Sequence, residues 1–432
     1  MAAASAIPSG WRRFAAERYR PFHTIAVGQS IMSALGSDAM VIPFVVALGA
    51  PAPLVTLIGT LPIAGSVLQA ANPRLLARFD GDLRRLTVFF VAAELRGFVL
   101  ALLAGAAALR LLDGGLAIAL VAATFGLGQA LALMSGANIA LWGAIVLPDD
   151  ERRLVAPRAA VLAAALAAVL LVPTSVLLDS GLATIGLWIY AVIFLTSGIG
   201  GLLVNAGVRR LARPGRVRPL IGEAQAGAPI PASFGRFLRV SVLASTGQGL
   251  VPYASVYALT ILHSSPGFAV ALGAVGAAAS LASSVVVGSF LAEGSASRVL
   301  RVSLVGRVVA AAFALAAFPA NPYAIACLLT AQTLFYAAGS AGVLATNERL
   351  FRLAPRDARV QCQGRFVGAT AVGVVGGSGV QAGVLAVAGP ASHLGFAALW
   401  AGAGLLRALA AVRTEVSPSW RPYAAAAEGR AA

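Results

Sequence analysis

Runs of about twenty apolar residues recur along the whole chain, and they constrain its fold more than any other feature. Each run is long enough to cross the roughly 30 Å of hydrocarbon in a bilayer as an α-helix. The 432 residues have a mean hydropathy of +0.87 and only 11% of them are charged, whereas soluble domains carry about 25% charged residues. The sequence therefore predicts an all-α, multi-pass membrane protein, and it excludes an ordinary soluble enzyme.

Twelve of these runs are predicted as membrane spans. They cover residues 24–48, 52–72, 87–111, 115–141, 158–178, 183–206, 239–262, 267–291, 299–318, 322–345, 366–388 and 394–412. The widest interval between them, 207–238, is rich in Arg, Pro and Gly, a composition that favours a flexible linker. It leaves six spans on either side. We therefore predict a cytoplasmic lead-in at 1–22, six-helix bundles at 23–206 and 239–412, a cytoplasmic linker at 207–238, and a cytoplasmic tail at 413–432.

The positive charge follows the predicted loops. The chain contains 32 Arg, no Lys, and a formal net charge of +16. Arg96, Arg307 and Arg407 lie well inside spans and Arg110 lies at the edge of an odd-numbered loop, while the other 28 occupy the two termini and the even-numbered loops, including the span ends that border them. Because cationic loops stay cytoplasmic, we predict that both termini face the inside of a bacterial cytoplasmic membrane. The basic charge then reports topology, and a nucleic-acid partner is not expected.

The remaining composition predicts neither metal nor cofactor. The two cysteines, Cys327 and Cys362, offer no disulfide framework and no metal-ligating set. No H-E-x-x-H zinc motif and no nucleotide-binding loop is present in the sequence. We expect a monomer whose partners are the lipid bilayer, a small organic solute and, as an open alternative, protons.

One arginine pattern occurs at the same place in each half. The pattern P-x3-R-x5-R follows the fourth span at Pro148, Arg152 and Arg158 and the tenth span at Pro355, Arg359 and Arg365. The two copies are offset by 207 residues. The loops after the second and eighth spans are also alike in their glycines and charges, and they include Glu293 in the second copy. Two related six-helix halves explain these repeats.

The loop after the second span resembles the signature G-x-L-x-D-R-x-G-R-R of the major facilitator superfamily. Leu75 matches directly, while Pro73 replaces the first glycine and Ala77 the aspartate. The remaining positions fit only with a slip of one residue, at Arg78, Gly81, Arg84 and Arg85. Asn138, Trp142, Pro148 and Arg152 also resemble the N-x3-W…P-x3-R pattern that follows the fourth helix in many members. The similarity covers nearly the whole chain. It implies twelve transmembrane helices in two pseudo-symmetric halves, with helices 1, 4, 7 and 10 lining a central cavity.

The charged cytoplasmic loops suggest a gate. Arginines at these helix ends can cap exposed carbonyls and pair with acids across the two halves. Such pairs would hold one conformation closed and break in the other. The residues assigned to this gate are Arg78, Arg85, Arg152, Glu293 and Arg359. The alternative is that these residues only anchor the topology. Ala77 stands where the signature has an aspartate, and the loss of that acid makes a gate in the first half less certain.

Ionisable residues inside predicted spans are the first candidates for function, because a charge in hydrocarbon costs about 2.5–3.5 kcal/mol on insertion scales. Asp38 lies near the middle of the first span, where a carboxylate can bind a cationic solute or carry a proton. Glu94 and Arg96 in the third span, with Arg307 in the ninth, form either a structural charge network or a proton relay. Arg407 lies close enough to the cytoplasmic face to extend toward it, and is expected to be structural.

Amide and phenol side chains recur on the spans expected to line a cavity. They are Gln129, Gln248, Tyr253, Gln332 and Tyr336. Their shared depth suits hydrogen bonding to a neutral or weakly polar organic solute. Taken singly, each could instead bond a neighbouring helix, at about 0.6 kcal/mol per hydrogen bond. With Asp38, these residues form the predicted substrate site.

We therefore predict a secondary active transporter of a small organic solute that works by alternating access, with proton coupling through Asp38 as a hypothesis. An intramembrane protease is disfavoured: Gly376-Gly377-Ser378-Gly379 resembles a protease serine motif, but the three histidines lie near helix ends. A channel is disfavoured because no filter or charged ring is visible. The fifth span has Pro173 without the neighbouring glycine that is usual in drug–proton antiporters of the superfamily, which argues against a multidrug efflux pump. A non-transporting receptor or scaffold with the same fold remains the main alternative.

Overall fold

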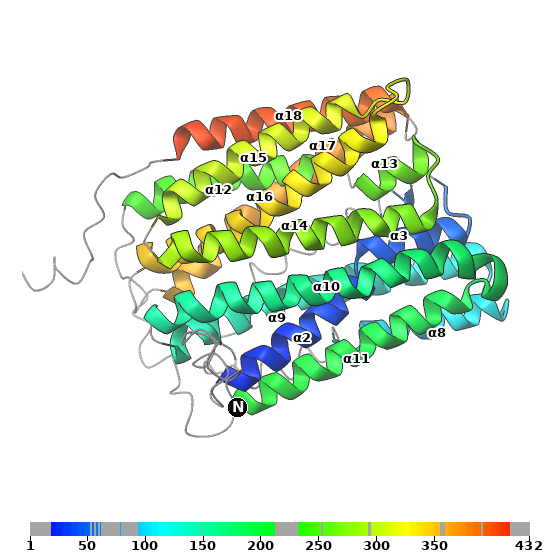
Figure 1. Ribbon diagram of the computed structural model, residues 1–432, viewed down its shortest axis with the longest axis horizontal. Helices are drawn as coiled ribbons and strands as arrows, with labels where there is room; N and C mark the ends of the chain where they lie inside the picture. The colour runs from blue at the N-terminus through cyan, green and yellow to red at the C-terminus, as the bar shows by residue number, and fades with distance from the viewer. Residues whose placement is uncertain are drawn as a thin grey trace, which may run out of the picture.

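The computed structural model describes residues 19–51, 54, 55, 58, 61, 78, 94–147, 149–211, 232–251, 254–292, 295–354, 359–389 and 392–414. Throughout this described part the chain is helical, with short connections (Figure 1). The first group of helices is α2 (Arg20–Leu35), α3 (Asp38–Ala47), α8 (Arg96–Ala108), α9 (Gly114–Val146), α10 (Asp149–Ile185) and α11 (Trp188–Leu211). The second group is α12 (Ala232–Leu250), α13 (Ala254–Thr260), α14 (Pro266–Ala292), α15 (Ala296–Ala316), α16 (Ala324–Leu353), α17 (Arg359–Ala388) and α18 (His393–Arg413).

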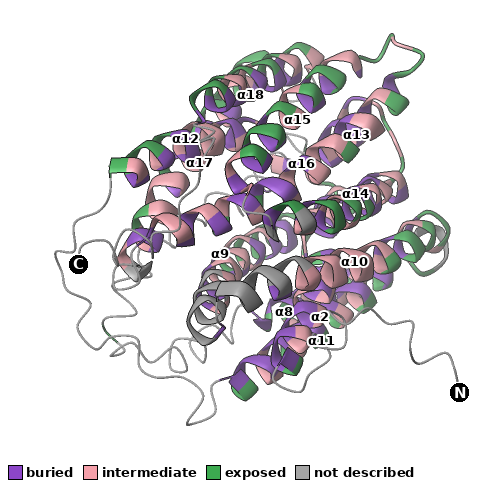
Figure 2. Ribbon diagram, turned by 60° about the vertical axis from the view of Figure 1, so that its left-hand side comes forward, coloured by how far each residue is buried: buried purple, intermediate pink, exposed green. Residues whose placement is uncertain are grey.

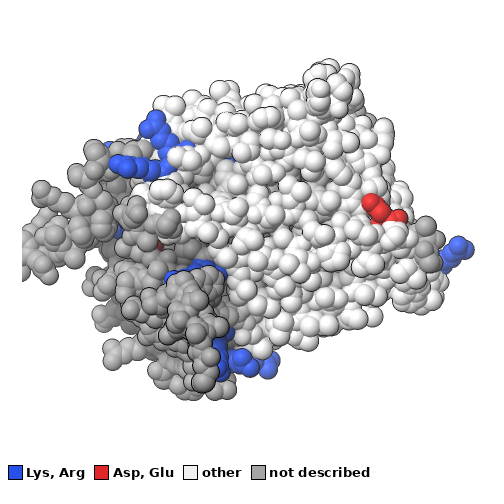
Figure 3. All heavy atoms as spheres, viewed as in Figure 1, with Lys and Arg blue, Asp and Glu red and all other residues white. Residues whose placement is uncertain are grey.

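Within the described residues, nine helical segments are long and apolar enough to cross a membrane. The outward faces of the helices are exposed (green in Figure 2). They carry large apolar side chains such as Leu102, Val169 and Leu405, each more than 60% exposed, so much of the outer surface is apolar. Water would oppose that exposure, whereas lipid tails accept it. Figure 3 shows a broad face without charges between the two ends of the bundle, and Arg side chains gathered at one of them. The chain is a multi-pass membrane protein, as predicted.

Most predicted spans correspond to helices. The fourth to sixth spans are α9, α10 and α11, and the eighth to twelfth are α14 to α18. Part of the third span is α8. The second span, 52–72, lies almost entirely outside the described residues, as do residues 1–18, 212–231 and 415–432. The predicted lead-in, linker and tail therefore remain predictions.

The first and seventh spans differ from the prediction, because each is broken into two helices. The first divides between α2 and α3. Gly36 ends α2, donating its N–H to the carbonyl of Met32 at 2.9 Å, and the Ser37 hydroxyl begins α3 by accepting the N–H of Ala39 at 3.2 Å. A glycine followed by a serine supplies both a helix end and an N-cap. The seventh span divides between α12, which ends at Leu250, and α13.

Small residues let the helices of each group approach closely. A Cβ added at Gly28 on α2 would lie 2.6 Å from the carbonyl oxygen of Gly200 on α11. In the second group, a Cβ added at Gly377 on α17 would lie 3.0 Å from Cα of Gly249 on α12. Glycines that permit close backbone approach are typical of membrane helix interfaces. Between the two groups, the most extensive contact is that of α10 with α14.

Candidate functional site

A central cavity lies between the two groups of helices. It has two adjoining compartments, of about 660 and 800 Å³, which share Asp38, Gly273, Tyr336 and other lining residues. A cavity of this size can hold a small organic molecule. Its lining includes residues of the four helices that the resemblance assigns to the cavity, namely the broken first and seventh spans, α9 and α16. It also includes α8, α10, α14, α15, α17 and α18.

The cavity extends toward one end of the bundle. Its lining there includes Asn347 and Phe351 near the end of α16, and Gln363 near the start of α17. The first described helix begins and the last one finishes at this same end (Figure 1). Toward the opposite end the lining stops at Leu171 on α10 and Ala269 on α14. Beyond that point α10 and α14 are joined by hydrogen bonds.

Asp38 borders both compartments. It is the first residue of α3, directly after the break in the first span. A carboxylate in the first turn of a helix is stabilised by the free backbone N–H groups and by the positive end of the helix dipole. The broken helix therefore explains how an acid can be placed at this depth. Asp38 was predicted for this site from its position in the span, but the helix end that supports it was not.

Arg96 and Gln129 form a pair in the compartment that also contains Asp38. Nη1 of Arg96 on α8 donates to Oε1 of Gln129 on α9. The Arg96 side chain is only 2% exposed and passes over Gly128. A Cβ added at Gly128 would lie 2.8 Å from the Cβ of Arg96. Asp38 and Arg96 line the same compartment without a salt bridge between them. The structure thus joins a predicted network residue to a predicted substrate residue.

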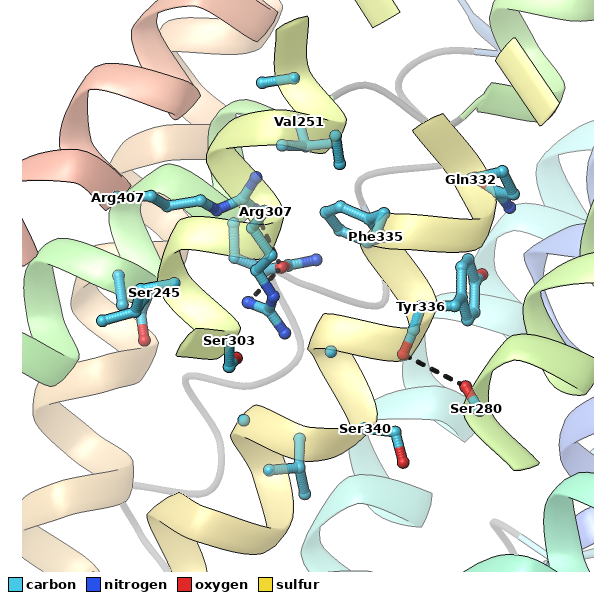
Figure 4. Close-up of a pocket in the computed structure, with 18 of the residues that line it drawn as sticks. Ser245, Val251, Ser280, Ser303, Arg307, Gln332, Phe335, Tyr336, Ser340 and Arg407 are labelled. Atoms are coloured by element: carbon cyan, nitrogen blue, oxygen red, sulfur yellow. Dashed lines mark hydrogen bonds between the residues drawn. The ribbon is translucent and has the colours of Figure 1, made fainter. Parts of the chain in front are cut away.

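A pair of guanidinium groups lies in the other compartment. Arg307 Nη1 and Arg407 Nη2 each donate to Oε1 of Gln248, both at 3.2 Å (Figure 4). The two guanidinium carbons lie 5.5 and 5.1 Å from the ring centroid of Phe335. The side chains come from α15, α18, α12 and α16, so four helices meet at one point. We call Gln248, Arg307, Phe335 and Arg407 the arginine cluster.

The expectation that Arg407 extends to the membrane face is wrong. Its side chain is 1% exposed and lines the cavity. The residue lies almost two turns before the end of α18, on the side that faces α12, so the guanidinium reaches Gln248 rather than the helix end. The position of Arg407 in the sequence indicates its depth in the membrane but not the direction in which its side chain points. The twelfth span was not expected to line a cavity, and no sequence pattern identified Phe335.

Gln332 and Tyr336 lie one turn apart on α16 and line the cavity with the arginine cluster (Figure 4). The Gln332 amide donates to the carbonyl of Leu272 at 3.4 Å. The Tyr336 ring lies against Gly276 of α14, where an added Cβ would be 2.8 Å from the ring. The Ser280 hydroxyl donates to the main-chain carbonyl of Tyr336 at 3.3 Å. These contacts hold α16 against α14.

Other predicted residues lie elsewhere or outside the described part. Glu94 is 2% exposed, does not line the described cavity, and lies against α11, where a Cβ added at Gly201 would meet its main chain. Tyr253, Arg85 and Glu293 lie outside the described residues. Arg152 and Arg359 lie on α10 and α17, but their side chains are not described, and Arg78 is exposed. The gate is therefore untested.

The serine that resembles a protease nucleophile has no histidine partner among the described residues. Ser378 Oγ is buried without a hydrogen-bond partner there. His393 instead forms a hydrogen bond of 2.8 Å between its Nδ1 and the Tyr257 hydroxyl. A nucleophilic serine requires a base within hydrogen-bond reach. The described geometry does not provide one.

No family model and no curated protein sequence matches the chain. Solved structures do. The proton:xylose symporter XylE, a major facilitator superfamily protein, superposes with a TM-score of 0.65 at 15% identity, covering 91% of this chain and 94% of its own. A bacterial homologue of the iron transporter ferroportin in an outward-facing state gives 0.63 at 13% identity, covering 91% and 98%. The inward open form of XylE from E. coli gives 0.61 at 15% identity, covering 92% and 96%.

Proposed function

Because the chain has the fold of the major facilitator superfamily, we propose that it is a secondary active transporter of a small organic solute. The observation that carries the proposal is the central cavity between two groups of membrane helices, whose lining includes Asp38, Arg96, Arg307 and Arg407. Ionisable groups within membrane spans typically mark solute or ion pathways. In transporters built from related halves, the substrate site lies between the halves near the bilayer midplane.

The proposed substrate site combines residues from both groups of helices. Asp38 and Gln129 belong to the first group, and Gln248, Gln332 and Tyr336 to the second. A solute that contacts both groups can couple its binding to their relative movement, which is what alternating access requires. Broken helices support this assignment, because irregular backbone at membrane depth is tolerated where it borders a cavity. Tyr253 remains a proposed member.

We assign the end at which α2 begins and α18 finishes to the cytoplasm. The cavity extends toward this end, while α10 and α14 are bonded to each other at the other. With this orientation the described conformation is accessible from inside. Arg209 and Arg210 at the end of α11 and Arg413 at the end of α18 are exposed, which agrees with the positive-inside rule. The cytoplasmic gate of Arg78, Arg85, Arg152, Glu293 and Arg359 would close this side in the opposite state.

Asp38 is the proposed site of proton coupling. The cavity lining described here contains one carboxylate, and it is that of Asp38. A carboxylate that meets solvent in one state and a closed site in the other can take up and release a proton once per cycle. Substrate and proton would then share one site, because Asp38 also borders the space for the solute.

The test uses purified protein in liposomes that contain a pH-sensitive dye. Sugars, amino acids, carboxylates and nucleosides are added separately to the wild type, to Asp38→Asn and to protein-free liposomes. We expect one solute class to cause a pH change that Asp38→Asn abolishes, and its sign distinguishes symport from antiport. A wild-type rate and pH dependence in Asp38→Asn would contradict coupling through this residue. Absence of any labelled-solute uptake across the panel would contradict transport and favour a receptor or scaffold.

A further inference from the structure

The arginine cluster holds two positive charges around one neutral acceptor. Gln248 Oε1 accepts from both guanidinium groups, at 3.2 Å each. An amide oxygen accepts hydrogen bonds but carries no net charge, so Gln248 does not neutralise either arginine. The Nε atoms of Arg307 and Arg407 are both buried without a hydrogen-bond partner. The cluster is therefore incomplete in both hydrogen bonds and charge.

No carboxylate of the described residues lies within ion-pair distance of either guanidinium. Arginine keeps its proton under all ordinary conditions, so neither charge can be removed by deprotonation. Burying two like charges together is unfavourable unless a counter-charge joins them. The contact of both with the Phe335 face offsets part of that penalty, but it adds no negative charge.

The whole cavity shares this imbalance. Among the residues that the structure describes, its two compartments are lined by Arg96, Arg307 and Arg407 and by one acid, Asp38. Arg96 is engaged by Gln129, another neutral amide. The described lining thus has a net positive charge within the membrane-spanning part of the protein. Such a field attracts anions and repels cations.

We propose that the transported solute is an organic anion whose carboxylate or phosphate is bound jointly by Arg307 and Arg407. The planar guanidinium groups offer paired N–H donors that match the oxygens of either anion. Apolar residues beside the cluster, among them Val251, Leu304 and Trp400, provide a surface for the organic part of the solute. This inference rests on the proposed function, and it names the substrate class of the same cavity.

The first test measures binding, which does not depend on transport. Purified protein in detergent is melted at constant ionic strength with matched pairs of probes: succinate and succinamide, benzoate and benzamide, glucose 6-phosphate and glucose. Inorganic phosphate alone is a further arm. We expect at least one anion to raise the melting temperature while its neutral partner does not, and the arms separate carboxylate from phosphate recognition. A panel in which no anion does so, or in which only neutral partners do, overturns the proposal.

The second test assigns the binding to the cluster. Isothermal titration of the stabilising anion into Arg307→Gln and Arg407→Gln should show affinity about tenfold to hundredfold weaker than wild type, as for loss of a charged hydrogen bond. Arg407→Lys keeps the charge but not the paired donors, so it should lose less. Arg301→Gln is the matched control, because Arg301 lies on the same helix as Arg307 but is exposed and away from the cavity lining.

The outcomes separate this inference from the proposed function. Variants that melt as cooperatively as wild type yet bind the anion unchanged overturn the inference. If Arg407→Gln does not fold, Arg407→Lys and Arg307→Gln decide the point. Anion binding that depends on the cluster, without uptake into liposomes, would support the inference and count against transport. Uptake of a neutral solute that is unaffected in both Arg→Gln variants would support transport and overturn the inference of an anionic substrate.

Discussion

The carboxylate of Asp179 on α10 caps the first turn of α14. Its Oδ1 accepts the N–H of Gly267 at 2.8 Å, and its Oδ2 accepts the hydroxyl of Ser265 at 3.0 Å. That hydroxyl in turn accepts the N–H of Phe268 at 3.1 Å. A side chain of the first helix group therefore accepts a free backbone N–H at the start of α14, a helix of the second group. If the protein works by alternating access, as we propose, this end must open, and the cycle then has to break these hydrogen bonds.

We expect Asp179→Ala to open this end of the protein more often. Removing a helix cap costs about 0.5–2 kcal/mol, and here the cap also joins the two helix groups. The measurement is maleimide labelling of a cysteine introduced at Ala269, which lines the cavity just below the contact and is 1% exposed. Cys327 and Cys362 are first replaced by alanine. Labelling should be several-fold faster in Asp179→Ala.

Asp113→Ala is the control for that experiment. Asp113 also caps a helix, accepting the N–H of Leu116 at 2.8 Å, but the cap lies within the first helix group. Its loss should lower stability without changing the labelling rate at position 269. Equal acceleration by both variants would mean that capping, and not the link between α10 and α14, controls access.

Gly276→Ala should destabilise the protein by displacing Tyr336. An alanine Cβ at this position would lie 2.8 Å from the base of the ring, which cannot move away without shifting α16. Overpacking of this kind costs about 1–3 kcal/mol. Gly273→Ala is the matched control on the same helix, because its Cβ would meet Ala39 at 3.4 Å, an ordinary contact. Thermal melting in detergent should show a clear loss for the first variant only, and equal melting temperatures would contradict the role given to Gly276.

The fold could be predicted because its determinants are repetitive. Apolar runs of span length, the arginine distribution and the loop pattern each occur many times, so single errors did not change the result. The fold of solved major facilitator structures confirms it. The helix breaks were missed because Gly36 and Ser37 are common within membrane helices. Only the way these residues pack in the folded chain makes them an end and a beginning.

The site was predicted less completely, because it depends on the direction in which each side chain points and not only on the depth of the residue in its span. Asp38, Gln248 and Tyr336 were chosen from their level in the spans, and they line the cavity. Arg407 has a similar pattern of apolar neighbours, but whether it turns inward or extends to the membrane face depends on how α18 is rotated. The pattern of apolar residues along one span does not reveal that rotation. Phe335 was missed for the same reason.

Gln129→Leu should leave the Arg96 guanidinium without the acceptor it has in the structure. Both residues lie in the compartment with Asp38, and Arg96 is 2% exposed, so water can replace the lost acceptor only from the cavity. Removing the partner of a buried charged group costs about 1–3 kcal/mol. Unfolding in detergent mixtures should therefore show a lower free energy of unfolding for this variant. Gln332→Leu is the control, because its one described hydrogen bond, to Leu272 at 3.4 Å, is long, and a loss as large as that of Gln129→Leu would contradict the importance of the Arg96 pair.

Glu94→Gln separates a proton relay from a buried acid without a role in transport. Both carboxylate oxygens of Glu94 are buried without a hydrogen-bond partner, and the residue does not line the described cavity. An amide in its place removes the penalty of burying a charge while keeping the shape. We expect transport and its pH dependence to match wild type in proteoliposomes, with stability equal or higher, whereas Asp38→Asn loses the pH dependence. A loss of proton-coupled flux in Glu94→Gln as large as that in Asp38→Asn would instead establish a relay through the third span.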